Sequence, residues 1–224
     1  MKPVILFGAG RVAEVVHYYF EYESRFEVAG VTCDRDLIRE PAFQGHRIVP
    51  FDEVDRHFPP SDFRLFVAIG YQHMNDVRAE RVAQAREKGY ELVSFVHEQA
   101  HFPENAELGE NCFIMNHALI QPHVRLGHNV IVWSGALIGH HTTIGDHCWV
   151  TSMAAICGDV TVGRNCFFAA NATAGNGIRI GDRCFLGANS LVTKDLPESS
   201  VVVEEVSARM PVTSDQFIRM SAFR

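Results

Sequence analysis

The sequence lacks a surplus of basic residues and lacks any long hydrophobic run. Lys plus Arg number 20 and Asp plus Glu number 27 in 224 residues, which gives a formal charge of −7. Nucleic-acid-binding proteins usually carry a basic surplus, so we expect no nucleic-acid partner. The first apolar run, Val4–Phe7, is too short for a signal-peptide core, and no segment approaches the roughly 20 apolar residues of a membrane span. We therefore expect a cytoplasmic protein without a membrane partner.

The sequence also has no CxxC pair, the spacing that most often marks cysteines in zinc and redox sites. Four of its six cysteines lie at multiples of eighteen residues: Cys112, Cys148, Cys166 and Cys184. Cysteines that share one repeat position are better interpreted as small, reduced core residues than as disulfides. With 47% hydrophobic and 21% charged residues, the chain can bury a core and should be globular.

The first hundred residues alternate strand and helix patterns. Short apolar runs predict strands at 4–7, 28–33, 66–69 and 92–96, and apolar residues at helical spacing predict helices at 12–20 and 77–88. Such alternation predicts a parallel sheet with helices on its faces. The layout of residues 1–97 resembles a Rossmann-like half-fold, about as long as one mononucleotide-binding half.

A six-residue repeat replaces the helical pattern over residues 98–195. Counted in sixes from Leu108 to Val192, thirteen of fifteen positions are Ile, Leu or Val, and the exceptions are Phe168 and Ala174. A small or β-branched residue follows these positions by four, and an apolar residue followed by Gly recurs every eighteen residues. Three six-residue sides therefore make one coil, and about five coils stack around a shared apolar column.

This spacing is typical of the hexapeptide-repeat β-helix, and the second half of the chain resembles the hexapeptide acyltransferase superfamily. The resemblance implies a left-handed parallel β-helix over 98–195, after the α/β half-fold and before a tail at 196–224. With both halves, the chain is similar to bacterial sugar acyltransferases, which include sialic acid O-acetyltransferases and N-acetyltransferases of nucleotide-linked 4-amino sugars.

An eighteen-residue coil places residue n beside residue n+18, one strand spacing of ~4.8 Å away. Two of the resulting outward columns are apolar and one is polar. The columns are Phe113, Ile131, Trp149, Phe167 and Phe185; then Leu119, Leu137, Ala155, Thr173 and Leu191; then Arg125, Thr143, Thr161 and Arg179. Two apolar outer faces predict packing against other copies, and the resemblance implies a homotrimer. The alternative is a monomer whose first domain and tail cover the aromatics.

Two adjacent histidines, His140 and His141, lie at a corner between two repeat sides. In the superfamily the catalytic histidine occupies this place, in a pattern like Ile-x-His-(Asp/Glu)-x-x-Ile-Gly. His140 matches that histidine, and His141 stands where the family usually has an acid. A neutral imidazole takes the proton of an amine or hydroxyl as that group attacks a thioester. His140 is thus the candidate base, unless it is a solvated corner histidine, and Asp159, one coil beyond His141, is a candidate source of a carboxylate.

The acetyl-CoA site is expected one coil beyond His140, at Gly158. This glycine has no side chain to cover its backbone N–H, and such a donor stabilises the oxyanion formed in acyl transfer. The resemblance also places a coenzyme A-contacting glycine here. We assign Ala155 and Asn176 to the same cofactor site.

A glycine-rich turn, Gly8-Ala9-Gly10-Arg11, follows the first expected strand and precedes the first helix. Taken alone, it fits an NAD site, because helix N-termini bind phosphates, or it serves only as a tight turn. The half-size domain and the attached β-helix favour a nucleotide-linked sugar. Its diphosphate would lie at Gly8, Gly10 and Arg11, with its ribose or base near Asp34 and Arg35. Gly70 follows another expected strand and would line the same crevice.

No catalytic metal is expected. His123 and His128 have the five-residue spacing of a carbonic-anhydrase-like zinc site on the same kind of β-helix. The third histidine of that pattern would fall on Glu87, in an expected helix outside the repeat.

The leading hypothesis is an enzyme that moves an acetyl group from acetyl-CoA to the amine of a nucleotide-linked amino-deoxy sugar, for polysaccharide synthesis. A second hypothesis keeps the donor and changes the acceptor to a hydroxyl, as in sialic acid O-acetylation. A third is a catalytically silent nucleotide-sugar-binding protein, which a histidine in place of the usual acid would allow.

Overall fold

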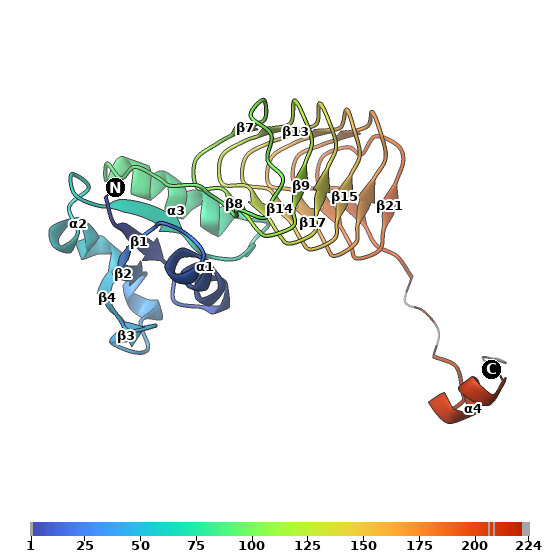
Figure 1. Ribbon diagram of the computed structural model, residues 1–224, viewed down its shortest axis with the longest axis horizontal. Helices are drawn as coiled ribbons and strands as arrows, with labels where there is room; N and C mark the ends of the chain where they lie inside the picture. The colour runs from blue at the N-terminus through green and yellow to red at the C-terminus, as the bar shows by residue number, and fades with distance from the viewer. Residues whose placement is uncertain (1, 206, 208, 221–224) are drawn as a thin grey trace.

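An α/β domain leads into a long stack of coils, and a short C-terminal helix lies beyond the last coil (Figure 1). The computed structural model describes residues 2–205, 207 and 209–220, so part of the expected tail at 196–224 lies outside the described residues. The helices are α1 (Arg11–Tyr22), α2 (Val54–His57), α3 (Asp76–Glu87) and α4 (Ser214–Met220). In the described residues, no helix combines the length and apolar character needed to cross a bilayer.

The N-terminal domain is built on a five-stranded sheet in the order β3-β4-β2-β1-β5. The strands are β1 (Val4–Phe7), β2 (Val28–Cys33), β3 (Ala42–Phe43), β4 (His46–Pro50) and β5 (Arg64–Val67). All neighbours are parallel except β3 and β4, which form an antiparallel hairpin. Alternate residues of β1 point to opposite faces: Val4 and Leu6 pack with α1, whereas Ile5 and Phe7 pack with α2 and α3. The expected α/β half-fold is confirmed.

The last strand expected in this domain belongs to the coils instead. Of residues 92–96, only Phe95–Val96 form a strand, β6, and it pairs with Phe113–Ile114 eighteen residues later. Leu92 makes a single bridge to Leu65 in β5. The coil pairing therefore begins three residues before the expected boundary at 98.

Residues 95–202 wind as a three-sided parallel β-helix of two-residue strands (Figure 1). We name its faces after their surroundings. The docked face holds β6 (Phe95–Val96), β8 (Phe113–Ile114), β11 (Ile131–Val132), β14 (Trp149–Val150), β17 (Phe167–Phe168), β20 (Phe185–Leu186) and β22 (Val201–Val202). The apolar face holds β9 (Leu119–Ile120), β12 (Leu137–Ile138), β15 (Ala155–Ile156), β18 (Thr173–Ala174) and β21 (Leu191–Val192). The polar face holds β7 (Glu107–Leu108), β10 (Arg125–Leu126), β13 (Thr143–Ile144), β16 (Thr161–Val162) and β19 (Arg179–Ile180).

The expected eighteen-residue register is confirmed along all three faces. Leu137 pairs with Ala155, for example, and Arg125 pairs with Thr143. The inward residues of the repeat form one buried column that runs through the coils, from Cys112 to Val192. Only the closing coil is shorter, because Phe185 pairs with Val201 sixteen residues later.

The corners between faces require left-handed backbone conformations. Non-glycine residues with positive φ recur every eighteen residues, and most of them are Asn, His or Asp. These types tolerate the left-handed region better than other L-residues, because their short polar side chains bond locally. The corner between the apolar and polar faces holds His123, His141 and Asp159, with φ of 65°, 59° and 60°. Backbone geometry therefore explains why so many histidines lie at coil corners.

The aromatic outward column, expected to pack against another copy, is covered by the chain's own N-terminal domain. Phe113 and Trp149 are each 2% exposed and belong to the cluster that contains α1 and β5 residues. The Phe113 ring lies 5.9 Å from that of Phe66 and 6.3 Å from that of Phe20. The expectation of two free apolar faces is thus wrong for the docked face. It holds for the apolar face, where Leu191 is 64% exposed.

Candidate active site

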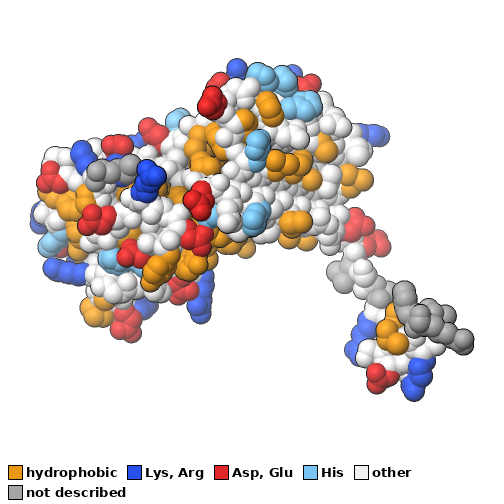
Figure 2. Space-filling view, viewed as in Figure 1, with side chains coloured by type: hydrophobic (Ala, Val, Ile, Leu, Met, Phe, Trp, Pro, Cys, Tyr) orange, Lys and Arg blue, Asp and Glu red, His pale blue; other side chains and the backbone are white. Residues whose placement is uncertain are grey.

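His140 and His141 occupy the turn between β12 and β13, at the corner opposite the docked face. Both side chains are exposed. In Figure 2 a group of histidine side chains gathers along the upper edge of the β-helix, over the coils. The left-handed φ of 59° at His141 turns the chain sharply, so the two adjacent rings meet at 83° with their centroids 5.3 Å apart.

Coil stacking fixes the position of His140 from both sides. Its backbone N–H donates to the Gln121 Oε1 of the preceding coil at 2.9 Å. On the other side its ring lies directly over Gly158, where an added Cβ would stand 2.7 Å from both the Cε1 and the Nε2 of His140. A side chain at position 158 would therefore displace the imidazole of His140 from this place. The sequence predicted the neighbour correctly but gave a different reason for the missing side chain.

The imidazole of His141 contacts that of His140 through their Nδ1 atoms. The two Nδ1 atoms lie 3.1 Å apart, so one must carry the proton and the other must accept it. With the proton on His140, its Nε2 keeps a lone pair and is the basic atom. His141 also stacks on His123, at 4.7 Å between ring centroids. An imidazole thus fills the orienting place that the family usually gives to an acid.

Asp159 contacts this pair only through its backbone, whose N–H donates to the carbonyl oxygen of His140 at 2.8 Å. Among the described residues, its carboxylate makes no hydrogen bond or ion pair. The suggestion that Asp159 supplies a carboxylate to the base finds no support in these contacts.

The backbone N–H of Gly158 is not open as expected. It donates to the Oδ1 of Asn176, one coil further on, at 3.0 Å. This bond uses the Oδ1 of Asn176, and the Nδ2 group has no other partner in the described part of the chain. The same bond links Gly158 and Asn176 across neighbouring coils. Ala155 lies three residues earlier on the apolar face, paired with Leu137 and Thr173.

The glycine-rich turn of the N-terminal domain lines two adjoining pockets. One, of about 360 Å³, includes Gly8, Gly10 and Asp34. The other, of about 480 Å³, includes Gly10, Arg11 and Gly70. Glycine is required at position 8, since its φ is +128° and an added Cβ would stand 2.6 Å from the carbonyl oxygen of Ala68. Five of the six expected nucleotide residues therefore meet at the carboxyl ends of β1, β2 and β5, as Rossmann-like topology predicts.

The sixth, Arg35, does not line these two pockets, but with Asp34 and Arg81 it lines a neighbouring cavity of about 650 Å³. Its guanidinium pairs with Asp52 at 2.8 Å and with Glu53 at 2.5 Å, and these two carboxylates raise its pKa. Asp34, by contrast, also lines the pocket of about 360 Å³ but is held by Arg81 through three hydrogen bonds of 3.0 to 3.1 Å. Arg81 thus fixes the one carboxylate that faces that pocket, a contact that the sequence did not reveal.

A buried arginine, also missed from the sequence, fixes the N-terminal domain on the coils. Arg78 is 0% exposed and donates to Asn129 Oδ1, to the carbonyl oxygen of His147 and to that of Gly70 at 2.9 to 3.2 Å. Its guanidinium lies 5.0 Å from the ring centroid of Trp149. Burial lowers its pKa to about 9, so it stays charged at neutral pH. One feature of the sequence could have indicated this burial: Arg78 lies four residues before Val82, on the buried side of α3.

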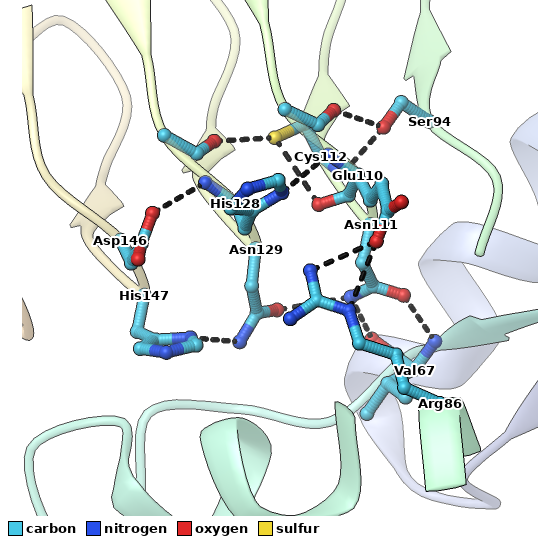
Figure 3. A network of polar contacts seen from close by, with 12 residues as sticks. Val67, Arg86, Ser94, Glu110, Asn111, Cys112, His128, Asn129, Asp146 and His147 are labelled. Atoms are coloured by element: carbon cyan, nitrogen blue, oxygen red, sulfur yellow. Dashed lines mark hydrogen bonds and ion pairs between the residues drawn. The ribbon is translucent and has the colours of Figure 1, made fainter. Parts of the chain in front are cut away.

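A ladder of side-chain amides continues this contact (Figure 3). Asn111 pairs with the edge backbone of β5, accepting from Val67 N–H at 2.7 Å and donating to Val67 O at 3.3 Å. It also donates to Asn129 Oδ1, and Asn129 donates to His147 Nδ1, both at 2.9 Å. The loop that follows β5 lines both of the pockets described above, so the ladder sets their orientation relative to the coils.

Within one chain, the two pockets and His140 lie on different sides of the β-helix. All the residues that line the two pockets belong to the N-terminal domain, which packs on the docked face. His140 lies at the corner shared by the other two faces.

The family comparisons match the coils. The model described as bacterial transferase hexapeptide (six repeats) matches residues 105–140 and 141–176, and the hexapeptide repeat of succinyl-transferase matches 159–194. Residues 105–194 therefore carry the hexapeptide repeats that these models describe. The expected left-handed β-helix and the resemblance to hexapeptide-repeat sugar acyltransferases are confirmed. A comparison with curated protein sequences gave no match.

Solved structures resemble the hexapeptide-repeat domain and the N-terminal domain together. PerB from Caulobacter crescentus, in complex with CoA and GDP-perosamine, is 29% identical with a TM-score of 0.80, covering 90% of this chain and 93% of that one. The acetyltransferase domain of PglB from Neisseria gonorrhoeae is 19% identical, with a TM-score of 0.79 and coverage of 90% and 96%. WeeI from Acinetobacter baumannii is 18% identical, with a TM-score of 0.67 and coverage of 91% and 97%. The last two similarities concern the fold alone.

Proposed function

We propose that this protein is an acetyl-CoA-dependent N-acetyltransferase that acts on the amine of a nucleotide-linked amino-deoxy sugar. The observation that carries the proposal is the likeness, over 90% of the chain at 29% identity, to a protein solved with CoA and GDP-perosamine. Other structures of a perosamine N-acetyltransferase from the same organism contain CoA, GDP-perosamine and a single histidine replaced by Asn or Ala.

The chemistry follows from the geometry at the histidine corner. The sugar amine reacts in its neutral form, after its ammonium proton has gone to solvent, and His140 Nε2 accepts one of its two remaining protons as the nitrogen attacks the thioester carbonyl. A C–N bond forms and the C–S bond breaks, so the products are the acetamido sugar and coenzyme A, whose thiolate takes up the proton from His140. The Asn176 amide, oriented by Gly158, offers an N–H donor for the developing oxyanion.

The acetyl donor would lie along the column of Gly158 and Asn176, with Ala155 beside it on the apolar face. The nucleotide would occupy the two pockets at Gly8, Gly10, Arg11, Asp34 and Gly70. Helix α1 begins directly after Gly10, and its N-terminus faces the place proposed for the diphosphate. Both proposed substrates are cytoplasmic metabolites, so we place the reaction in the cytoplasm.

We further propose a homotrimer, in which the sugar from one copy reaches the histidine corner of the next. Two observations support it. The pockets and His140 lie on opposite sides of one chain's β-helix, and the apolar face beside His140 is exposed at Leu119 and Leu191. Three copies with closed symmetry would bury that face and pair each pocket with a neighbouring base.

The proposal is tested by coenzyme A release from acetyl-CoA with UDP-, dTDP- and GDP-linked amino sugars. We expect release with at least one of them, and an acetamido product by mass spectrometry. Nucleotide-sugar binding without release would indicate a silent binding protein. Turnover of free sialic acid, without turnover of any amino sugar, would indicate an O-acetyltransferase. Either result would contradict the proposed reaction.

A further inference from the structure

Three side chains with metal-binding groups meet between α1 and the β3–β4 hairpin. A ring nitrogen of His17, a carboxylate oxygen of Glu21 and a ring nitrogen of His46 all lie within 4.8 Å of one another. Across the described residues, this is the one group of three such ligands. His17 and Glu21 are four apart on α1, so they project from the same face of the helix.

The state of His17 points to a missing ligand. The residue is 6% exposed, and its Nε2 atom is buried with no hydrogen-bond partner. Buried polar atoms are almost always paired, because an unpaired one loses its bonds to water without replacement. The ring is also confined by its neighbours, with its centroid 5.1 Å from that of His46 and 6.5 Å from that of Phe43.

The hairpin fixes the third ligand from a distant part of the chain. Its two-residue turn, Gln44-Gly45, has φ of 49° and 82°, the left-handed pair that tight hairpins use. His46 follows this turn directly and pairs with Phe43 across the hairpin. The cluster therefore combines a local pair on a helix with one residue set by the sheet edge.

We propose that His17, Glu21 and His46 form a binding site for a divalent transition-metal ion, for which Zn²⁺ is the best match. Two imidazoles and one carboxylate are an established zinc donor set, with bonds of about 2.0–2.2 Å and a fourth position for water. Donor atoms around such an ion lie roughly 3.4 Å apart by these bond lengths, so small side-chain rotations close the group. Glu21 is exposed and His46 is half-buried, which gives the ion a path from solvent.

The ion would clamp α1 to the edge of the sheet. The same helix begins after Gly10, which lines both nucleotide pockets, so the clamp would steady the helix that carries the proposed phosphate site. The three ligands belong to the N-terminal domain, and His140 lies at the corner opposite the docked face. The site therefore contributes no group to acetyl transfer, and the metal-binding proposal does not depend on the proposed function.

The test uses the full chain, freed of metal with a chelator and then titrated with Zn²⁺. We expect one tightly bound ion per chain and a higher melting temperature, since an ion that binds the folded state stabilises it. Co²⁺ in place of Zn²⁺ should give the visible absorption bands of a tetrahedral site. Absence of stoichiometric binding, or bands of six-coordinate Co²⁺ alone, would overturn the proposal.

Variants decide which residues hold the ion. His46→Ala and, separately, Glu21→Gln should weaken Zn²⁺ binding by at least about 100-fold, because loss of even an outer-shell partner costs 10–100-fold. Glu21 is exposed, so its variant should fold even if the other does not. The matched control is His57→Ala, whose imidazole lies 3.9 Å from Glu53, four residues earlier, but is not part of a group of three.

The stacked histidines of the β-helix are the competing site for added metal. His123→Ala removes one of them without touching the N-terminal domain. We expect it to bind Zn²⁺ as the unmodified chain does. If His123→Ala abolishes binding while His46→Ala does not, the ion belongs to the coil corner and the proposed site is wrong.

Discussion

The Nδ1 atoms of His140 and His141 lie 3.1 Å apart, so the proposed base is oriented by a second imidazole. An imidazole partner carries no fixed negative charge, unlike the acid that the family pattern has at this place. The corner can therefore orient His140 without stabilising the imidazolium that forms during the reaction. Three predictions test the parts of this arrangement one at a time.

His140→Ala should lower kcat for acetyl transfer by at least about 100-fold, the usual contribution of a general base. Nucleotide-sugar binding, measured by calorimetry, should be unchanged, because the pockets lie in the other domain. His101→Ala is the matched control, since His101 is also an exposed histidine of the β-helix. Near-normal transfer by the His140 variant would remove it from the mechanism.

His141 should act as a positioning residue. His141→Ala should reduce kcat more than it raises KM, because the base would lose its fixed orientation. His141→Glu should recover much of kcat, since a carboxylate accepts the same Nδ1 proton. It should also move the acidic limb of the pH–rate profile to higher pH, because a negative charge favours the imidazolium. Equal pH profiles for the Glu variant and the unmodified enzyme would contradict this role.

Gly158→Ala should displace the His140 ring, because the added methyl would stand 2.7 Å from two of its atoms. A base moved by about 1 Å can cost roughly 100-fold in rate. The matched control is Gly175→Ala on a later coil, where the nearest atom would be 3.4 Å away, an ordinary contact. Circular dichroism of both variants should be unchanged. Equal turnover by the two variants would show that the ring position is unimportant.

The sequence predicts neighbours well wherever the repeat sets them. Because each coil uses eighteen residues, the contact between His140 and Gly158 follows from counting alone. The same arithmetic places Asn176 beside Gly158. It cannot say that the Asn176 Oδ1 takes the Gly158 N–H, since that depends on a side-chain torsion that the period does not fix.

The eighteen-residue period does not predict the contacts between the two domains. The aromatic column from Phe113 to Phe185 has the pattern of a free apolar face, and only the structure shows that α1 and β5 cover it. Arg78 and Asn129 are 51 residues apart, and no period relates them. No period relates His17 and His46 either. They lie close together because the sheet order brings the β3–β4 hairpin beside α1.

The apolar face should be the surface through which copies associate. Leu119→Glu places a charge on this face, where Leu119 is 37% exposed in the single chain. Sedimentation should show monomers for this variant and trimers for the unmodified protein, with loss of acetyl transfer if each site needs two copies. Thr143→Glu, on the exposed polar face, is the control and should leave the trimer intact. A monomeric unmodified protein with full activity would refute the shared site.

The inter-domain ladder should make stability depend on pH through His147. Burial lowers the pKa of His147 to about 4, and the neighbouring Arg78 also lowers it, whereas Asp146 raises it. The unfolded chain binds this proton near pH 6.5 and the folded chain resists it. Stability is therefore complete above pH 6.5, falls as pH drops toward 4, and changes no further below that. The loss is at most about 3 kcal/mol, reduced by solvent screening of the partly exposed ring.

His147→Asn should remove this dependence while keeping the fold. The corner at position 147 has φ of 64°, and the coils on either side use Asn129 and Asn165 at the same corner, so asparagine suits the backbone. Urea unfolding between pH 4 and 7.5 should show a smaller loss of stability for the variant than for the unmodified protein. His117→Asn, at an exposed corner with φ of 59°, should keep the full loss. Parallel curves for all three proteins would mean that the proton taken up on unfolding belongs to another group.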